Sequence, residues 1–165
     1  MQDILKKKGS TIFLRLALIV IALVAVALCI FAFPEMWRSF NFEDQNIARP
    51  MRCILLGMFV SAIPFIIALW ESWKLLNYID KGIAFSELST KALNNIKYCA
   101  ITIAVFMGSV LPFFYGAAEL DDAPGVVIIG MAFVGAPIVV AVFAALLQKL
   151  LRNAIEIKSE NDLTI

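Results

Sequence analysis

Tyr78 to Lys97, with the sequence YIDKGIAFSELSTKALNNIK, is the stretch that decides the fold. Two long apolar segments precede it and two follow it, so it is the middle connection of the chain. Gly82 is a helix breaker, and Ser86 is a favourable N-cap for a new helix that begins near Glu87. The stretch therefore predicts a helical hairpin, with its tip over residues 80–86, between the second and third of four long helices.

The composition indicates a membrane protein. Of the 165 residues, 62% are hydrophobic and only 16% are charged, and the mean hydropathy is +0.89. A soluble domain is about half apolar and about a quarter charged, and one membrane-spanning helix needs about 20 apolar residues. The chain therefore predicts a single all-α membrane domain, a four-transmembrane-helix bundle. The expected spans are about 12–33, 51–73, 96–117 and 124–148.

The first span follows a short basic segment and carries one early charge, Arg15. Because Arg15 lies near the end of the span, its side chain is expected to snorkel to the lipid headgroups. The basic start resembles a signal peptide, but the apolar run continues to Pro34, well beyond a signal core of about 7–15 residues. We expect a retained membrane helix, followed by a loop over residues 34–50.

The last three helices are expected to be longer than the membrane is thick. The helical pattern runs without a break over residues 51–80 and 87–116, and 30 residues rise about 45 Å, against a hydrocarbon core of about 30 Å. Leu88, Ala92 and Ile96 share one face of the third helix, which predicts its packing side. The fourth helix continues in the same way into a tail over residues 149–165.

Each of the last three spans contains a proline, Pro64, Pro112 and Pro137. Proline removes a backbone hydrogen bond and kinks a helix, so these positions are candidate hinges, with a fixed bend that serves packing as the alternative.

Small residues in the same spans permit helices to approach closely. Gly57 and Ser61 form a small-xxx-small pair in the second span, and Gly130 and Gly135 predict close packing of the fourth.

The distribution of basic residues predicts the orientation. Eleven Lys and Arg residues lie in the N-terminal segment, the middle connection with its helix ends, and the C-terminal segment, whereas three lie in the first loop and none in the third. The positive-inside rule then places both termini and the hairpin tip in the cytoplasm of a bacterial inner membrane.

The sequence offers little chemistry for catalysis. It has no histidine, which removes the commonest general base, metal ligand and haem ligand. Cys29, Cys53 and Cys99 form no CxxC pair and are expected to act as small apolar residues. The spans contain no paired carboxylates and no nucleophile beside a base. We therefore expect no enzyme activity, no cofactor and no metal, and the net charge of +1 favours no direct binding of nucleic acid.

Four acidic residues leave alternatives open. Glu71 lies three residues before Lys74, which predicts a helical ion pair at the membrane surface, with a gate or relay acid as the alternative. Glu119, Asp121 and Asp122 lie in the third loop, where Asp121 and Asp122 are expected to cap the start of the fourth helix. An outer cation site is the alternative for these three acids.

Three stretches of the chain resemble a known family. They are GIAFSELSTKALNNIKYCA, LDDAPGVVIIG and VFAALLQKLLRNAIEIKSENDLTI, and they are similar to the bacterial membrane family catalogued as domain of unknown function 2975. The resemblance implies four membrane helices and no established enzyme activity. It also implies a neighbouring gene for a small helix-turn-helix regulator of the Cro/C1 type. The family supplies no agreed catalytic or binding residues to carry over.

These observations favour a non-enzymatic sensor or regulatory partner, which acts on a helix-turn-helix regulator through its hairpin tip and tail. One alternative is that tip and tail merely pack on each other and cap the bundle. Others are a small transporter or channel, which we expect to be a homo-oligomer, and a purely structural or assembly subunit. The candidate partner-binding residues are Gly82, Phe85, Ser86, Glu160, Asp162, Leu163 and Ile165.

Overall fold

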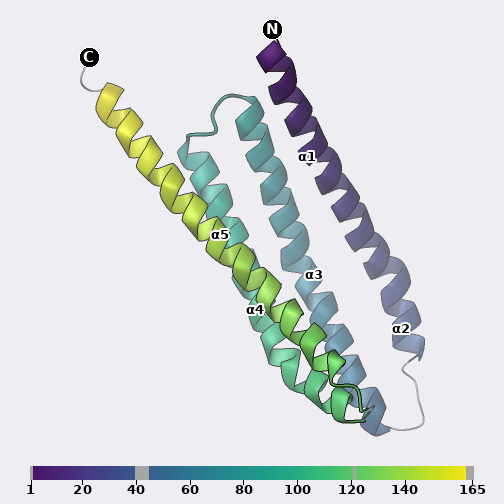
Figure 1. Cartoon of the computed structure of the whole chain (residues 1–165). Helices are drawn as coiled ribbons and strands as arrows, with labels where there is room; N and C mark the ends of the chain where they lie inside the picture. Colours follow the sequence, from purple (N-terminus) through teal and green to yellow (C-terminus); the bar gives the residue numbers. More distant parts are fainter. Residues whose placement is uncertain (1, 40–44, 121, 163–165) are drawn as a thin grey trace.

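The structure is a computed structural model, and it describes residues 2–39, 45–120 and 122–162. The described residues form helices joined by short turns (Figure 1). In chain order these are α1 (Gln2–Ala27), the π-helix η1 (Leu28–Ala32), α2 (Phe33–Ser39), α3 (Gln45–Asp80), α4 (Glu87–Leu120) and α5 (Gly125–Asp162). Four stretches are long and apolar enough to cross a membrane. The expected all-α bundle of four membrane helices is confirmed.

Three of the long helices form the body of the bundle. α4 packs extensively against both α3 and α5, and a buried cluster of Ile54, Val110, Phe114 and Ala117 fills the contact between α3 and α4. α1 lies alongside α3 (Figure 1) and packs against it over a much smaller area. The first helix is therefore an outer element on a three-helix body.

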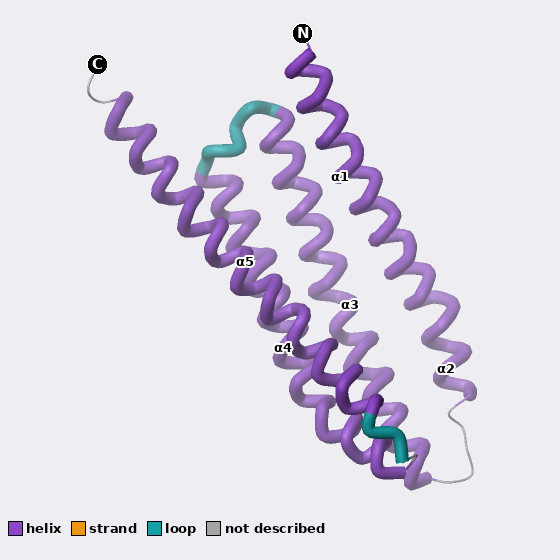
Figure 2. Tube along the Cα trace, in the orientation of Figure 1, coloured by secondary structure: helices purple, strands orange, loops and turns teal. Residues whose placement is uncertain are grey.

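The ends of the helices divide into two groups. The N-terminus, the turn between α3 and α4, and the C-terminal end of α5 lie at one end of the bundle (Figure 1). The connection from α4 to α5 lies at the other end (Figure 2). At the first end, the last turns of α5 lie apart from the α3–α4 turn. The described part of α5 therefore does not cap the tip of the hairpin.

The turn between α3 and α4 is built as the sequence indicates. Gly82 has a φ of 73°, the left-handed conformation that ends a helix, and the Ile83 N–H donates to the Tyr78 carbonyl at 3.0 Å. Ser86 precedes the first residue of α4, and its Oγ accepts a hydrogen bond from the Ser89 N–H at 3.4 Å. Gly82 as the helix breaker and Ser86 as the N-cap are both confirmed.

The three helices of the body are longer than the hydrocarbon core. α3, α4 and α5 contain 36, 34 and 38 residues, which correspond to about 54, 51 and 57 Å, against about 30 Å of hydrocarbon. All three continue through Pro64, Pro112 and Pro137, respectively. Each helix is therefore several turns longer than a helix that crosses the hydrocarbon at right angles.

The expected loop over residues 34–50 is wrong at both of its ends. Residues 34–39 belong to α2, and residues 45–50 are the first turns of α3. Pro34 is tolerated because it follows the π-helix, in which the Phe33 N–H bonds to the Leu28 carbonyl, one residue further back than in an α-helix. That shift of register relieves the conflict that the proline ring would otherwise create with the preceding turn.

The expected packing face of α4 is wrong at its first turn. Leu88 is 48% exposed, whereas Ser89 is completely buried. The Ser89 hydroxyl lies 3.5 Å from the Ser86 hydroxyl and from the Ile83 carbonyl, so its polar atom is satisfied inside the turn. Ser89 therefore takes the inward position that the apolar pattern gives to Leu88, and Ala92 continues the buried stripe.

Two glycines allow neighbouring helices of the body to approach each other closely. A Cβ added to Gly57 of α3 would clash with Val110 Cγ2 of α4, and one added to Gly130 of α5 would lie 2.8 Å from Phe114 Cγ of α4. A Cβ at Gly135 would meet nothing within 4 Å. Close packing is confirmed at Gly57 and Gly130 and is wrong at Gly135, where the helix faces open space.

Because Gly57 has no room for a side chain, we expect Gly57→Ala to destabilise the bundle by about 1–3 kcal/mol, the usual range for overpacking. Gly108→Ala is the matched control, since a Cβ there meets nothing within 4 Å. Thermal unfolding in detergent measures both, and Gly108→Ala should leave the midpoint unchanged or raise it. Equal stability of the two variants would contradict the close approach.

Candidate functional site

The tip of the α3–α4 hairpin presents apolar side chains outward. Phe85 is 61% exposed and Ile83 is 41% exposed, and both lie in the turn that Gly82 and Ser86 shape. Leu88, in the first turn of α4, extends the same exposed apolar surface. We call Ile83, Phe85 and Leu88 the apolar tip. Of the three predicted binding residues in the turn, Gly82 and Ser86 shape the backbone, and Phe85 is the side chain available for contact.

The predicted residues of the tail are only partly described. Glu160 is an exposed residue in the last turn of α5, and Asp162 is the final residue of that helix. Leu163 and Ile165 lie outside the described residues. The described end of α5 lies apart from the turn between α3 and α4 in Figure 1.

Arg15 joins α1 to the end of α3 beside the turn. Its Nη2 lies 2.6 Å from Asp80 Oδ2 and donates to Asn77 Oδ1 at 2.6 Å. Its guanidinium carbon lies 5.3 Å from the centroid of the Trp73 ring. Three residues of α3 therefore contact the Arg15 side chain, and its expected position at the lipid headgroups stays a prediction. We call this cluster the Arg15 clamp.

The Arg15 clamp lies directly beside the turn between α3 and α4. Asp80 is the last residue of α3 and directly precedes the turn. The side chains of Arg15 and Asp80 remain about a third exposed, so screening limits this ion pair to about 1 kcal/mol or less. A contact of this strength holds α1 in register with α3 and is weak enough to open.

A second polar network joins α4 to α5, and the sequence analysis missed it. The Lys97 Nζ donates to Gln148 Oε1 at 3.2 Å, and the Gln148 Nε2 donates to Asn94 Oδ1 at 3.3 Å. The sequence does contain a signal for this network, because the three polar residues lie where the apolar runs of α4 and α5 end. The network fixes the α4–α5 pair on the tip side of the spans.

Glu71 is paired as predicted, and its side chain is buried within the bundle. The Lys74 Nζ lies 2.8 Å from Glu71 Oε1, and Glu71 is 8% exposed. The pair is half-buried because α3 continues beyond Glu71 and packs against α4 along its length. The predicted partner, Lys74, is confirmed, while the position of the pair at the membrane surface stays a prediction.

Asp122 of the third loop acts differently from the prediction. Asp122 has a φ of 50°, and the following Ala123 N–H donates to the Ala118 carbonyl at 3.0 Å, so Asp122 ends α4 rather than starting α5. Asp121 lies outside the described residues. Glu119 is exposed, and no cluster of three or more potential metal ligands occurs among the described residues.

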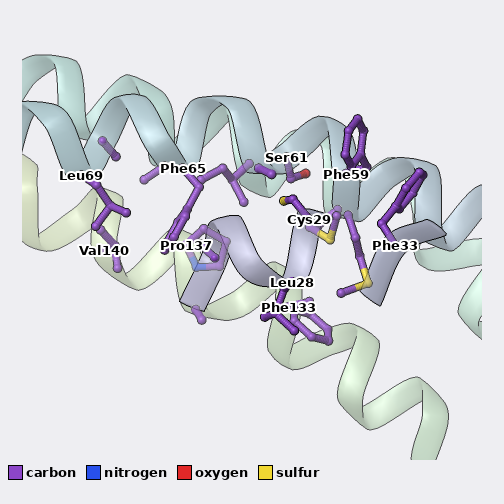
Figure 3. Close-up of a pocket in the computed structure, with 18 of the residues that line it drawn as sticks. Leu28, Cys29, Phe33, Phe59, Ser61, Phe65, Leu69, Phe133, Pro137 and Val140 are labelled. Carbon is purple, nitrogen blue, oxygen red and sulfur yellow. The ribbon is translucent and has the colours of Figure 1, made fainter. Parts of the chain in front are cut away.

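A groove lies within the membrane-spanning part of the bundle (Figure 3). It has a volume of about 610 Å³, and α1, η1, α2, α3, α4 and α5 all contribute to its wall. The residues that line it are apolar except for Cys29, Ser61 and Ser72, and none of them is charged. We call it the intramembrane groove. The sequence could not reveal it, because residues far apart in the chain form its wall.

Comparison with known proteins identifies the family and leaves the activity open. The family model described as "Protein of unknown function (DUF2975)" matches residues 8–165. The uncharacterized membrane protein YoaS of Bacillus subtilis (strain 168) is 52% identical over 156 residues, which cover 94% of this chain and 98% of YoaS. No solved structure matches the chain. The chain belongs to the DUF2975 family and is, like its relative, a membrane protein.

Proposed function

We propose that this protein is a non-enzymatic membrane regulator, which binds a small cytoplasmic helix-turn-helix transcription regulator through the apolar tip. The observation that carries the proposal is the exposure of Ile83, Phe85 and Leu88 on a turn that is otherwise rigidly built. Exposed aromatic and aliphatic residues on an ordered backbone are typical of the centre of a protein interface.

The position of the tip supports a partner in water rather than in lipid. Between the expected end of the second span at residue 73 and the end of α3 at Asp80, the helix rises about 10 Å. Charged residues Lys81, Glu87 and Lys91 are exposed around the turn. A lipid-buried turn would leave these charges unsolvated at considerable cost.

The distribution of charge supports a cytoplasmic tip. The tip lies at the same end of the bundle as both ends of the chain (Figure 1), and this end carries the excess of Lys and Arg. The positive-inside rule assigns such an end to the cytoplasm of a bacterial inner membrane. Helices α3, α4 and α5 then extend into the cytoplasm.

The Arg15 clamp supplies a route from the membrane to the tip. α1 packs on the body over a small area, so a stimulus that shifts α1 meets little resistance. Its shift opens the ion pair between Arg15 and Asp80 and so changes the contacts of the residue that directly precedes the turn. The candidate hinges Pro64, Pro112 and Pro137 absorb the motion within the body. A stimulus acts in this way only if it binds the two arrangements with different affinities.

A small transporter or channel is the second candidate, and the groove argues against it. An ion or polar solute needs polar or charged groups along its path. The intramembrane groove has no charged residue in its wall and only three polar ones. Its chemistry suits an apolar molecule, which favours a sensor over a conduit.

Labelling with a membrane-impermeant maleimide tests the orientation. In a variant without the three native cysteines, Lys81→Cys should react only after the cells are opened, because the tip is cytoplasmic. Glu119→Cys, at the other end of the bundle, should react in intact cells. The reverse pattern would place the tip outside and remove the proposed partner.

Photocrosslinking tests the partner. A photoreactive residue in place of Phe85 in native membranes should capture a helix-turn-helix protein, identified by mass spectrometry, because Phe85 is the most exposed side chain of the apolar tip. Tyr115 is the matched control, since it is 58% exposed near the opposite end of α4. A third probe at Leu163 asks whether the tail takes part. Capture of the same regulator from Phe85 and Tyr115 alike, or from neither, contradicts the proposal.

Charge reversal tests the coupling. Arg15→Glu should repel Asp80, loosen α1 and lower the Phe85 crosslinking yield several-fold, and the double variant Arg15→Glu/Asp80→Arg should restore it. Arg152→Glu is the control, because it disrupts an exposed ion pair with Glu156 that is 3.7 Å long and belongs to α5 alone. If the single and double variants crosslink equally, the Arg15 clamp does not control the tip.

A further inference from the structure

The intramembrane groove has one feature that apolar packing does not explain. Ser61 of α3 lies in its wall (Figure 3), is 6% exposed, and its hydroxyl has no hydrogen-bond partner within the described structure. Other serine and threonine hydroxyls of the spans are satisfied by their own helices. Ser72 donates to the Ala68 carbonyl at 2.8 Å, and Thr102 donates to the Tyr98 carbonyl at 2.9 Å.

An unpartnered hydroxyl in an apolar wall is costly, because the membrane interior offers no water to satisfy it. The Ser61 hydroxyl oxygen is covered in this rotamer, so a change of χ1 to another staggered position is the step that presents it to a molecule in the groove. Small-molecule sites have this composition: mostly apolar walls, with a few polar groups that fix the orientation of the ligand.

We propose that the intramembrane groove binds a neutral lipophilic small molecule with one hydrogen-bonding group, which the Ser61 hydroxyl anchors. The volume of about 610 Å³ lies within the range of about 300–1,000 Å³ that is usual for small-molecule sites. No charged side chain lines the groove, so a charged ligand would have no counter-ion there.

The depth of Ser61 in the bundle excludes one other partner for its hydroxyl. Ser61 lies near the middle of α3, about 15 Å or more from either end of the expected span. The headgroup of a bilayer lipid at the membrane surface therefore does not reach its hydroxyl.

The ligand has a route of entry from the lipid. The side of the groove between α1 and α5 is not closed, because α1 packs against α3 rather than against α5. Leu28 of η1 and Phe133 of α5 both line the groove (Figure 3). The inference does not depend on the regulator, since the site stands whether or not the apolar tip binds a partner.

Photolabelling with benzophenone tests the site in the purified full-length protein in lipid nanodiscs. The probe is neutral and lipophilic, its carbonyl accepts one hydrogen bond, and on irradiation it attaches to C–H groups that lie close to that carbonyl. We expect saturable labelling of Met58 and Phe65, which line the groove about one turn on either side of Ser61. Peptide mass spectrometry locates the adducts.

Three variants decide the role of the hydroxyl. Ser61→Ala should raise the half-saturating probe concentration about 2- to 10-fold, the effect of losing one neutral hydrogen bond, and Ser61→Thr should retain the wild-type value. Ser109→Ala is the matched control and should change nothing, because the Ser109 hydroxyl is exposed and donates to the Phe106 carbonyl at 2.7 Å.

Filling the groove gives an independent test. Ala136→Phe places a ring in the wall of the groove and should abolish labelling of Met58 and Phe65, with the thermal midpoint confirming that the bundle is folded. The proposal is overturned if adducts spread over lipid-facing residues such as Val105 without saturation. It is also overturned if Ser61→Ala and Ala136→Phe both label like the wild type.

Discussion

The close approach of α3 and α4 at Gly57 is the constraint on which the rest of the structure depends. With no side chain at Gly57, Val110 of α4 packs directly against the backbone of α3. Gly130 gives Phe114 the same access to α5. Helices in a membrane gain little from burying apolar surface, so they associate through such tight packing and through interhelical hydrogen bonds. These contacts make one body of three helices and leave α1 outside it.

The proposed function depends on the difference between the tightly packed three-helix body and the loosely packed α1. The body holds the α3–α4 turn in a fixed conformation, with Gly82 and Ser86 satisfying the ends of both helices. α1 adds the Arg15 clamp at the turn and one wall of the intramembrane groove. A molecule in the groove and a partner at the apolar tip would therefore both contact elements that α1 can move. Under the proposed function, that arrangement would connect a membrane stimulus with a response at the apolar tip.

Local signals in the sequence predicted the helices and turns of the fold well. Contacts between side chains far apart in the chain could not be predicted from those signals. The breaks at Gly82 and Ser86 could be predicted because left-handed backbone and helix capping depend on a few adjacent residues. Asp122 was misplaced because it ends one helix only a few residues before another begins. The pairing of Arg15 with Asp80 joins residues 65 positions apart, and no pattern within a single helix indicates such a partner. The intramembrane groove needs residues from every helix, so it appears only in three dimensions.

The most direct test of the central claim is the equilibrium binding of the purified helix-turn-helix regulator to this protein in nanodiscs. The account predicts saturable binding that Phe85→Ala weakens by about 30-fold, because removing an interface hot spot costs about 2 kcal/mol or more. Tyr115→Ala, at the other end of the bundle, should leave the affinity unchanged. Absence of binding to the wild-type protein, or equal binding by Phe85→Ala, would contradict a regulatory role for the tip.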